Sequence, residues 1–265
     1  MKKSLLAISL ASLWFMATPA SAQITTLMFD DAEDLAGDVE SEWQASAEFG
    51  LLYTTGNTDT ESLKAKLNLA KDYVQWRHKG MVDYYRAEQT DQSTDEQILT
   101  ADRLFLSAQS NYKFDADSKS SIFVFGSYEE DQFSGYEYQG TVAVGYGARY
   151  RYSETLYADY EAGPGYSVDK PLIDGIPQES ESSPILRLAG NLNWDISKTS
   201  RFTALAATEV GEDNTRSRAE VSVSANINEA LALKVSVGAT HNSFVADSMV
   251  EKLDTETAVT IVYTF

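Results

Sequence analysis

Residues 141–152 read TVAVGYGARYRY, and their side chains alternate between two kinds along the chain. Apolar and aromatic residues face small, polar or charged ones: Val142, Val144, Tyr146, Ala148, Tyr150 and Tyr152 against Thr141, Gly145, Gly147, Arg149 and Arg151. Because successive side chains of a strand point to opposite faces, this pattern predicts a β-strand with one apolar face and one face that carries arginine.

The same two-residue period recurs in eleven other segments of the chain. They cover residues 42–53, 63–73, 78–88, 99–112, 122–128, 156–163, 186–194, 202–210, 217–227, 233–239 and 254–265. One segment is poorly phased, because residues 122–125 are apolar at every position. Counted along the chain, residues 141–152 are the sixth of twelve segments. The connections after even-numbered segments are short, and most of the connections after odd-numbered segments are longer and more acidic. These features are typical of outer-membrane proteins, so we predict an all-β fold, a transmembrane antiparallel β-barrel of about 12 strands.

Alternation alone also fits a soluble antiparallel sheet, so the placement of charge matters. In the better-phased segments, charges of both signs stay on the polar face: Lys64, Lys66, Arg149, Arg151, Asp159, Glu161, Arg187, Arg218, Glu220 and Lys234. A charge that faced lipid at the midplane would cost about 2–4 kcal/mol. We therefore predict that these ten side chains line the lumen of a barrel and neutralise one another there.

Aromatic residues gather near the ends of the segments, as they do in the girdles of membrane barrels. Trp43, Tyr128 and Trp194 are examples. The last segment alternates to Tyr263 and Phe265, and a final amphipathic strand that ends in Phe resembles the signal read by the barrel-assembly machinery. We predict that role for these two residues, with this machinery and outer-membrane lipids as partners of the chain.

The first 22 residues have the parts of a secretory signal peptide. Lys2 and Lys3 give a basic start, an apolar run follows, and residues 20–22 read Ala-Ser-Ala. We expect export through the Sec pathway and cleavage after Ala22. Residues 23–41 are rich in acids and are predicted to form a periplasmic segment. Residues 42–265 are predicted to form the barrel in the outer membrane of a Gram-negative bacterium.

Composition argues against several classes of protein. The chain has no cysteine, which rules out disulfides and thiol chemistry, and its formal charge of −19 opposes binding to nucleic acid. After residue 22, no apolar stretch approaches the roughly 18 residues that a membrane helix needs. A closed barrel is the other structure that can span a membrane.

Two short motifs are similar to those of a known family. Residues 56–60 read Gly-Asn-Thr-Asp-Thr, and residues 161–166 read Glu-Ala-Gly-Pro-Gly-Tyr. Together with the layout of the mature chain, they resemble the DUF481 family of salt-induced outer membrane proteins. The resemblance implies an outer-membrane barrel and a link to salt or osmotic stress, and it brings no catalytic residue. The residues themselves predict a hairpin turn at the first motif and a bend or an edge at a strand end at the second.

The sequence contains no pattern typical of a cofactor or metal site. His241, Asn242 and Ser243 are the residue types of an outer-membrane phospholipase, but neighbouring strand residues point to opposite faces and do not converge. Acid pairs such as Asp159 and Glu161 are interpreted as members of lumen ion pairs. We therefore expect a non-catalytic barrel, either a narrow passive channel or an envelope component. The alternatives are an outer-membrane enzyme acting on lipid or peptide and a soluble secreted β-protein, and the oligomeric state stays open.

Overall fold

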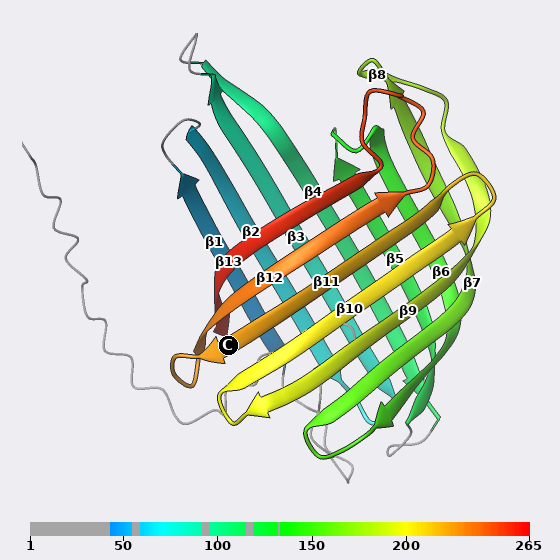
Figure 1. Ribbon diagram of the computed structural model, residues 1–265. Helices are drawn as coiled ribbons and strands as arrows, with labels where there is room; N and C mark the ends of the chain where they lie inside the picture. Colours follow the sequence, from blue (N-terminus) through cyan, green and yellow to red (C-terminus); the bar gives the residue numbers. More distant parts are fainter. Residues whose placement is uncertain (1–42, 55–58, 92–95, 115–118, 132) are drawn as a thin grey trace, which may run out of the picture.

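In the computed structural model, the described residues are 43–54, 59–91, 96–114, 119–131 and 133–265 (Figure 1). The predicted signal peptide, the acidic segment 23–41 and residues 56–58 of the first family motif lie outside this part of the chain. Within the described residues, no helix is long and apolar enough to cross a membrane.

Thirteen strands make up the described chain. They are β1 (Gln44–Thr54), β2 (Asp59–Asp72), β3 (Trp76–Asp91), β4 (Glu96–Lys113), β5 (Ser120–Asp131), β6 (Tyr136–Arg151), β7 (Leu156–Ile173), β8 (Ile176–Pro177), β9 (Glu181–Ser197), β10 (Ser200–Gly211), β11 (Thr215–Asn226), β12 (Leu231–Asn242) and β13 (Leu253–Thr264). Neighbouring strands are antiparallel, and the ladders between β6 and β7 and between β1 and β13 close the ring. The short β8 pairs only with the end of β7, so twelve strands form the barrel. This confirms the predicted fold class and strand number.

The two ends of the barrel differ (Figure 1). At the lower end in this view, where β1 begins and β13 ends, the connections are short: residues 73–75, 152–155, 198–199 and 227–230. The longest described connections, residues 174–180 and 243–252, lie at the upper end. Short turns at one end and longer loops at the other follow the predicted pattern.

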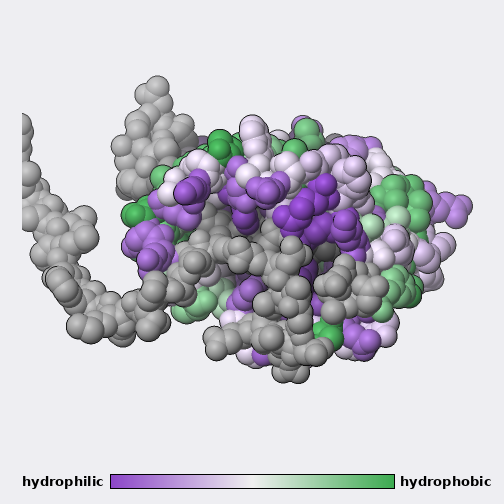
Figure 2. All heavy atoms as spheres, turned by 90° about the horizontal axis from the view of Figure 1, so that it is seen from below, coloured by the Kyte–Doolittle hydropathy of each residue, from purple (hydrophilic) through white to green (hydrophobic). Residues whose placement is uncertain are grey.

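Apolar side chains cover much of the outer surface. Val142 is 62 % exposed, and Val144 and Tyr146 on the same face of β6 are exposed as well. Seen from the lower end, hydrophobic residues lie on the flanks of the molecule and hydrophilic residues lie between them (Figure 2). The alternation in residues 141–152 therefore separates an apolar outer surface from a polar interior.

The poorly phased segment is explained by an apolar part of the interior. Phe123 and Phe125 of β5 are buried with Ala143, whereas Ile122 and Val124 are exposed on the outer surface. β5 is apolar on both faces because one face forms part of the outer surface of the barrel and the other packs in its interior.

The tightest packing lies in the lower half of the lumen. The largest fully buried side chains include Phe123, Tyr157, Asp159 and Asn193, from the lower parts of β5, β7 and β9. These four residues are called the lower layer below. Inward side chains at the same end of the opposite wall are buried too: Ser46, Asn68 and Ser224. Side chains from both walls are therefore buried at this level, although Asn68 also borders a cavity above it.

The prediction of a strand end at residues 161–166 is wrong. β7 runs through this motif to Ile173, with Pro164 in its middle. Among the described pairs, the ladder between β6 and β7 skips Val144 and Gly145, which leaves room for a residue that has no N–H. A Cβ on Gly163 would lie 2.1 Å from the carbonyl oxygen of Val144. Glycine therefore allows the two backbones a closer approach than a side chain would permit.

Candidate functional site

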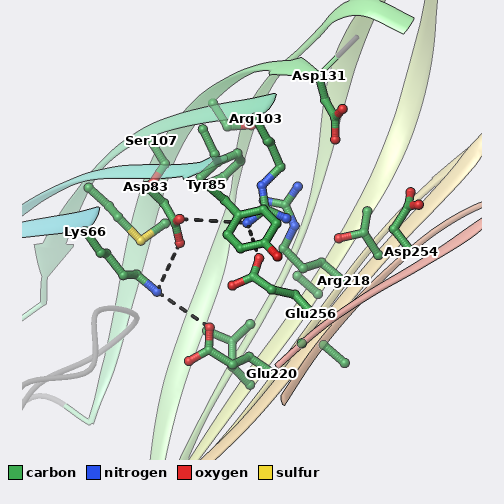
Figure 3. Close-up of a pocket in the computed structure, with 18 of the residues that line it drawn as sticks. Lys66, Asp83, Tyr85, Arg103, Ser107, Asp131, Arg218, Glu220, Asp254 and Glu256 are labelled. Carbon is green, nitrogen blue, oxygen red and sulfur yellow. Dashed lines mark hydrogen bonds and ion pairs between the residues drawn. The ribbon is translucent and has the colours of Figure 1, made fainter. Parts of the chain in front are cut away.

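The lumen above the lower layer contains a cavity of about 410 Å³, called the upper cavity below (Figure 3). It extends from Lys79 and Gln109 in the lower part of the barrel to Asp131 and Asp254 near the upper end. Seven cationic and seven anionic side chains line it: Lys64, Lys66, Lys79, Arg103, Arg187, Arg216 and Arg218, and Glu48, Asp83, Asp131, Glu209, Glu220, Asp254 and Glu256. The lining is balanced in charge, although the chain as a whole is strongly acidic.

Ion pairs cross the upper cavity between strands that are far apart in the ring. Arg103 Nη2 of β4 lies 2.8 Å from Glu256 Oε2 of β13, and β1, β2 and β3 separate these strands. Lys66 Nζ of β2 lies 3.5 Å from Asp83 Oδ2 and 3.6 Å from Glu220 Oε2 of β11 (Figure 3). Opposite walls are thus tied together through their side chains, so the lumen is narrow.

Two arginines of the cavity lie over phenylalanine rings. The Cζ atom of Arg218 on β11 is 4.2 Å from the ring centre of Phe105 on β4, which is the strand directly opposite in the ring. Arg187 on β9 is 3.7 Å from the ring centre of Phe125. A guanidinium group stacks well on an aromatic face, and such contacts hold the cation in one place. The contact between Arg218 and Phe105 therefore joins two directly opposite walls of the lumen.

Two buried glutamates anchor the arginines on the β5 to β11 side. Glu209 accepts hydrogen bonds from Arg187 Nη1 and Arg216 Nη2, both at 2.8 Å, and from the hydroxyl of Thr141 at 2.9 Å. Glu129 accepts a hydrogen bond from Arg218, and Arg216 Nη1 lies 3.7 Å from it. Each carboxylate is therefore shared by two guanidinium groups, as expected for charges that are buried only when paired.

Charged pairs also fill the lower layer. Arg149 donates from Nε to Asp159 Oδ1 at 2.8 Å and from Nη2 to Oδ2 at 3.2 Å, and Asp159 is 0 % exposed. The same guanidinium lies 4.6 Å from the ring centre of Tyr157. Gln109 donates to Glu161 Oε1 at 2.5 Å just above this group. These contacts place paired polar side chains in the lower lumen.

The ten predicted lumen residues lie at different places on the inner surface. Five of them line the upper cavity: Lys64, Lys66, Arg187, Arg218 and Glu220. Arg149, Asp159 and Glu161 lie below it, and Lys234 Nζ lies 3.2 Å from Glu48 Oε1 and 3.0 Å from Glu220 Oε1. Arg151 is exposed at the lower end of β6, with its guanidinium 5.8 Å from the ring centre of Tyr157.

The two predicted assembly-signal residues lie on the outer surface. Tyr263 and Phe265 are exposed at the lower end of β13, and their rings pack edge to face with centres 4.7 Å apart.

Several central residues are not among those ten, above all Asp83, Arg103, Glu129, Glu209 and Arg216. Each takes an inward position, two or four residues along its own strand from another inward side chain. Continuing the two-residue period through β3, β4, β5, β10 and β11 would have found them. The apolar inner residues of β5 hide that period in the sequence.

The structure also places the residues weighed for catalysis. His241 is exposed on the outer surface and Asn242 is buried on the inner one, so the two do not meet. In the described part of the chain, no group of three or more His, Cys, Asp or Glu residues is arranged to hold a metal ion.

A family model and a protein of known sequence both match most of this chain. The model of the family described as "Protein of unknown function, DUF481" matches residues 47–265. The "Uncharacterized protein YdiY" of Escherichia coli (strain K12) is 24% identical over 258 residues, which cover 97% of this chain and 95% of that protein.

Two solved structures are similar to this chain to different degrees. The NanC porin is similar with a TM-score of 0.50 and 7% identity, over 84% of this chain and 98% of that one. The translocator domain of the autotransporter NalP from Neisseria meningitidis has a TM-score of 0.46 and 12% identity, over 83% of this chain and 86% of that one. At 7% identity, the likeness to the NanC porin concerns the fold alone, which is that of an outer-membrane β-barrel.

Proposed function

The chain belongs to the DUF481 family, and we propose that it is a non-catalytic outer-membrane protein that acts as a narrow passive channel for small charged solutes. The observation that carries this proposal is the upper cavity, a space of about 410 Å³ inside the barrel with seven cationic and seven anionic side chains on its walls. A sealed structural barrel would have no need of such a space.

The chemistry of the cavity suits charged solutes. A small ion or zwitterion loses much of its hydration in a narrow lumen, and charges of the opposite sign on the wall replace it. Because neither sign dominates the lining, the wall can hold a positive or a negative group. Contacts across the lumen limit its width: Arg103 pairs with Glu256 between strands that are not neighbours, and Arg218 stacks on Phe105 of the opposite wall.

The lower layer makes the proposed channel slow. Phe123, Tyr157, Asp159 and Asn193 are fully buried, so a solute passes only when these side chains move. We therefore expect a small unit conductance, with the lower layer as the main resistance.

The surroundings of the barrel are part of the proposal. The exposed outer residues of β6, such as Val142 and Tyr146, contact outer-membrane lipids, and the barrel-assembly machinery reads Tyr263 and Phe265. Cleavage after Ala22 and a role in salt or osmotic stress are proposed with it, the latter from the family resemblance. A deletion strain should then grow more slowly than its parent in raised salt, and equal growth would remove the stress role.

Single-channel recording in planar lipid bilayers tests the channel. The wild type should give small conductance steps, and Phe123→Ala should enlarge them because it removes a ring from the lower layer. Val124→Ala changes the next residue, which faces outward, and should conduct like the wild type. If none of the three conducts at any salt concentration, the channel is excluded.

The enzyme alternative needs a separate test. Refolded protein incubated with phospholipids and with a peptide library should leave both unchanged. Turnover of either would overturn the non-catalytic part of the proposal.

A further inference from the structure

The ring closes between β1 and β13 over an unusually short ladder. Ser46–Phe49 pair with Ile261–Thr264, and the N–H of Phe265 donates to the carbonyl oxygen of Ala45 at 2.9 Å. Every other pair of neighbouring strands in the described ring is joined over eleven or more residue pairs. This seam is therefore complete only near the lower end.

Above the short ladder, both strands continue without each other. β1 runs on to Thr54 and pairs there with β2 alone, and β13 between Leu253 and Thr260 pairs with β12 alone. The two strands are still close at Gly50, where a Cβ would lie 2.8 Å from the carbonyl oxygen of Val259. The two strands diverge toward the upper end of the barrel (Figure 1). Exposed backbone groups are costly in lipid, so an unpaired upper seam needs another partner. We call the part above this contact, residues 51–54 of β1 and 253–258 of β13, the open seam.

Charged residues of the lumen stand directly behind the open seam. Lys64 of β2 pairs with Glu256 of β13 across it. Lys66 Nζ lies 3.6 Å from Glu220 Oε2, so a second cation of β2 lies close to an anion of β11, on the β13 side of the seam. All four residues line the upper cavity. Behind the open seam, the β2 side thus brings cations and the β13 side brings anions, whereas Lys234 of β12 and Glu48 of β1 pair with the opposite polarity beside the closed ladder.

The side chains that flank the seam on the outer surface are apolar. Phe49 and Leu51 of β1 and Val259 and Ile261 of β13 are exposed on the outer surface, where the proposed barrel meets acyl chains. A molecule that reached the seam sideways from the membrane would meet apolar side chains first and paired charges behind them. That order matches an amphiphile with its headgroup leading.

We infer that the open seam is a lateral portal through which a zwitterionic amphiphile of the outer membrane places its headgroup in the upper cavity. A phosphate group would take the place of Glu256 at Lys64 and reach Lys66, and an ammonium group would lie against Glu220 or Glu256. The acyl chain would leave between β1 and β13, next to Leu51 and Val259. This binding site goes beyond the proposed conduction of solutes and does not depend on it.

Closing the seam with a disulfide tests the portal directly. Two residues beyond the last pair of Phe49 with Ile261, continued register would bring Leu51 opposite Val259. The chain has no cysteine, so the double variant Leu51→Cys/Val259→Cys contains one possible disulfide. The oxidised or reduced protein is then placed in phosphatidylethanolamine vesicles, and native mass spectrometry counts the lipid that stays bound on release. Wild type and reduced variant should retain one lipid, and the oxidised variant none.

A matched control places the disulfide where the barrel is already complete. Val221 and Val237 are partners in the full ladder between β11 and β12, so Val221→Cys/Val237→Cys should retain the lipid when oxidised. Lys64→Gln, which requires no disulfide, should weaken lipid retention about tenfold, as expected for the loss of one charge-assisted hydrogen bond. These two variants keep the test valid if the seam disulfide disturbs folding.

Several results would overturn the inference. The oxidised seam variant could retain the lipid, its control could lose the lipid equally, or Lys64→Gln could bind as the wild type does. Soluble glycerophosphoethanolamine that occupied the cavity equally well with the seam locked would show an aqueous route instead. A seam that takes up a strand of another protein would leave the purified chain without bound lipid. Conductance is not measured, so failure here leaves the proposed channel to its own test.

Discussion

The upper cavity and the lower layer are built on the same twelve strands, yet one is hollow and the other is filled. In the lower layer, Asp159 is 0 % exposed and its partner Arg149 is held over the ring of Tyr157. In the upper cavity, the side chain of Arg218 is 25 % exposed although it touches the opposite wall. Strand number fixes the diameter of such a barrel, and inward side chains decide whether a given level is open.

The difference has an energetic side. A charge with no access to water depends entirely on its partner, whereas a charge beside a polar cavity keeps some solvent when the partner is removed. The same substitution should therefore be more damaging in the lower layer than at the upper end of the cavity.

The largest effect is expected from Asp159→Ala. It removes a fully buried carboxylate from the guanidinium of Arg149, whose side chain is 18 % exposed, and should lower the free energy of unfolding by about 3 kcal/mol. Asp254→Ala, at the exposed upper end of the cavity, should cost less than about 1 kcal/mol. Urea unfolding of both variants in detergent micelles measures the two losses. Equal losses would mean that the two levels of the lumen do not differ in burial.

A smaller effect is expected from Glu129→Gln, at a buried residue beside the upper cavity. This change keeps the shape but weakens the bonds with Arg216 and Arg218, and should lower the free energy of unfolding by about 1.5–3 kcal/mol. Glu130→Gln, one residue on and exposed outside, is the matched control. An equal loss of unfolding free energy in Glu130→Gln and Glu129→Gln would contradict the ion pairs between Glu129 of β5 and the arginines of β11.

Gly135→Ala should disturb the packing of the connection 243–252 at the upper end of the barrel. Gly135 has a φ of 81°, and a Cβ there would lie 2.4 Å from Cγ1 of Val245 in the connection 243–252. Gly175 has a φ of 72° and nothing within 4 Å of a Cβ, so Gly175→Ala carries the same backbone strain, roughly 1–2 kcal/mol, without the clash. Hydrogen exchange should show residues 243–252 released in the first variant alone. Equal exchange in both would mean that Val245 does not pack on Gly135.

The smallest effect concerns pH at the same rim. Asp247 accepts N–H bonds from Met249 at 2.8 Å and Asp174 at 3.1 Å, and these hold the pKa of its carboxyl below the ordinary value. A lowered folded pKa stabilises the loop above the ordinary pKa of about 3.9, and this contribution is lost as the pH falls through the folded pKa. The amide shifts of Met249 and Asp174 should therefore move on acidification below about pH 4.

Asp247→Asn serves as the control for this titration. The amide oxygen of asparagine still accepts a hydrogen bond but does not titrate, so its variant should lack the transition. A transition of the same size in both proteins would assign it to another group.

Alternation in the sequence predicts much of the fold, because the period of two shows which face each side chain takes. It separates Arg149 from Tyr150 and Lys66 from Leu67, and it yields the correct number of strands. It does not show how far a side chain reaches across the lumen. The contact between Arg218 and Phe105 depends on the stagger of strands that are remote in sequence.

Two further features can be recognised only in the folded barrel. The close crossing at Gly163 resembles a strand end in the sequence, since glycine and proline usually interrupt strands, yet β7 continues through it. The short ladder between β1 and β13 joins the two ends of the barrel, and no local pattern records its length. The upper cavity and the open seam therefore follow from the register of strands and not from their residues alone.

Labelling of single cysteines in sealed vesicles tests most directly whether these strands enclose a polar lumen within lipid. Ser107 faces the upper cavity and Leu106, next to it on β4, is exposed on the outer surface. With a membrane-impermeant maleimide, Ser107→Cys should react, whereas Leu106→Cys and the lower-layer variant Asn193→Cys should stay protected. Rapid labelling of Leu106→Cys with protection of Ser107→Cys would contradict the closed barrel, because water would then lie on the apolar side of the sheet.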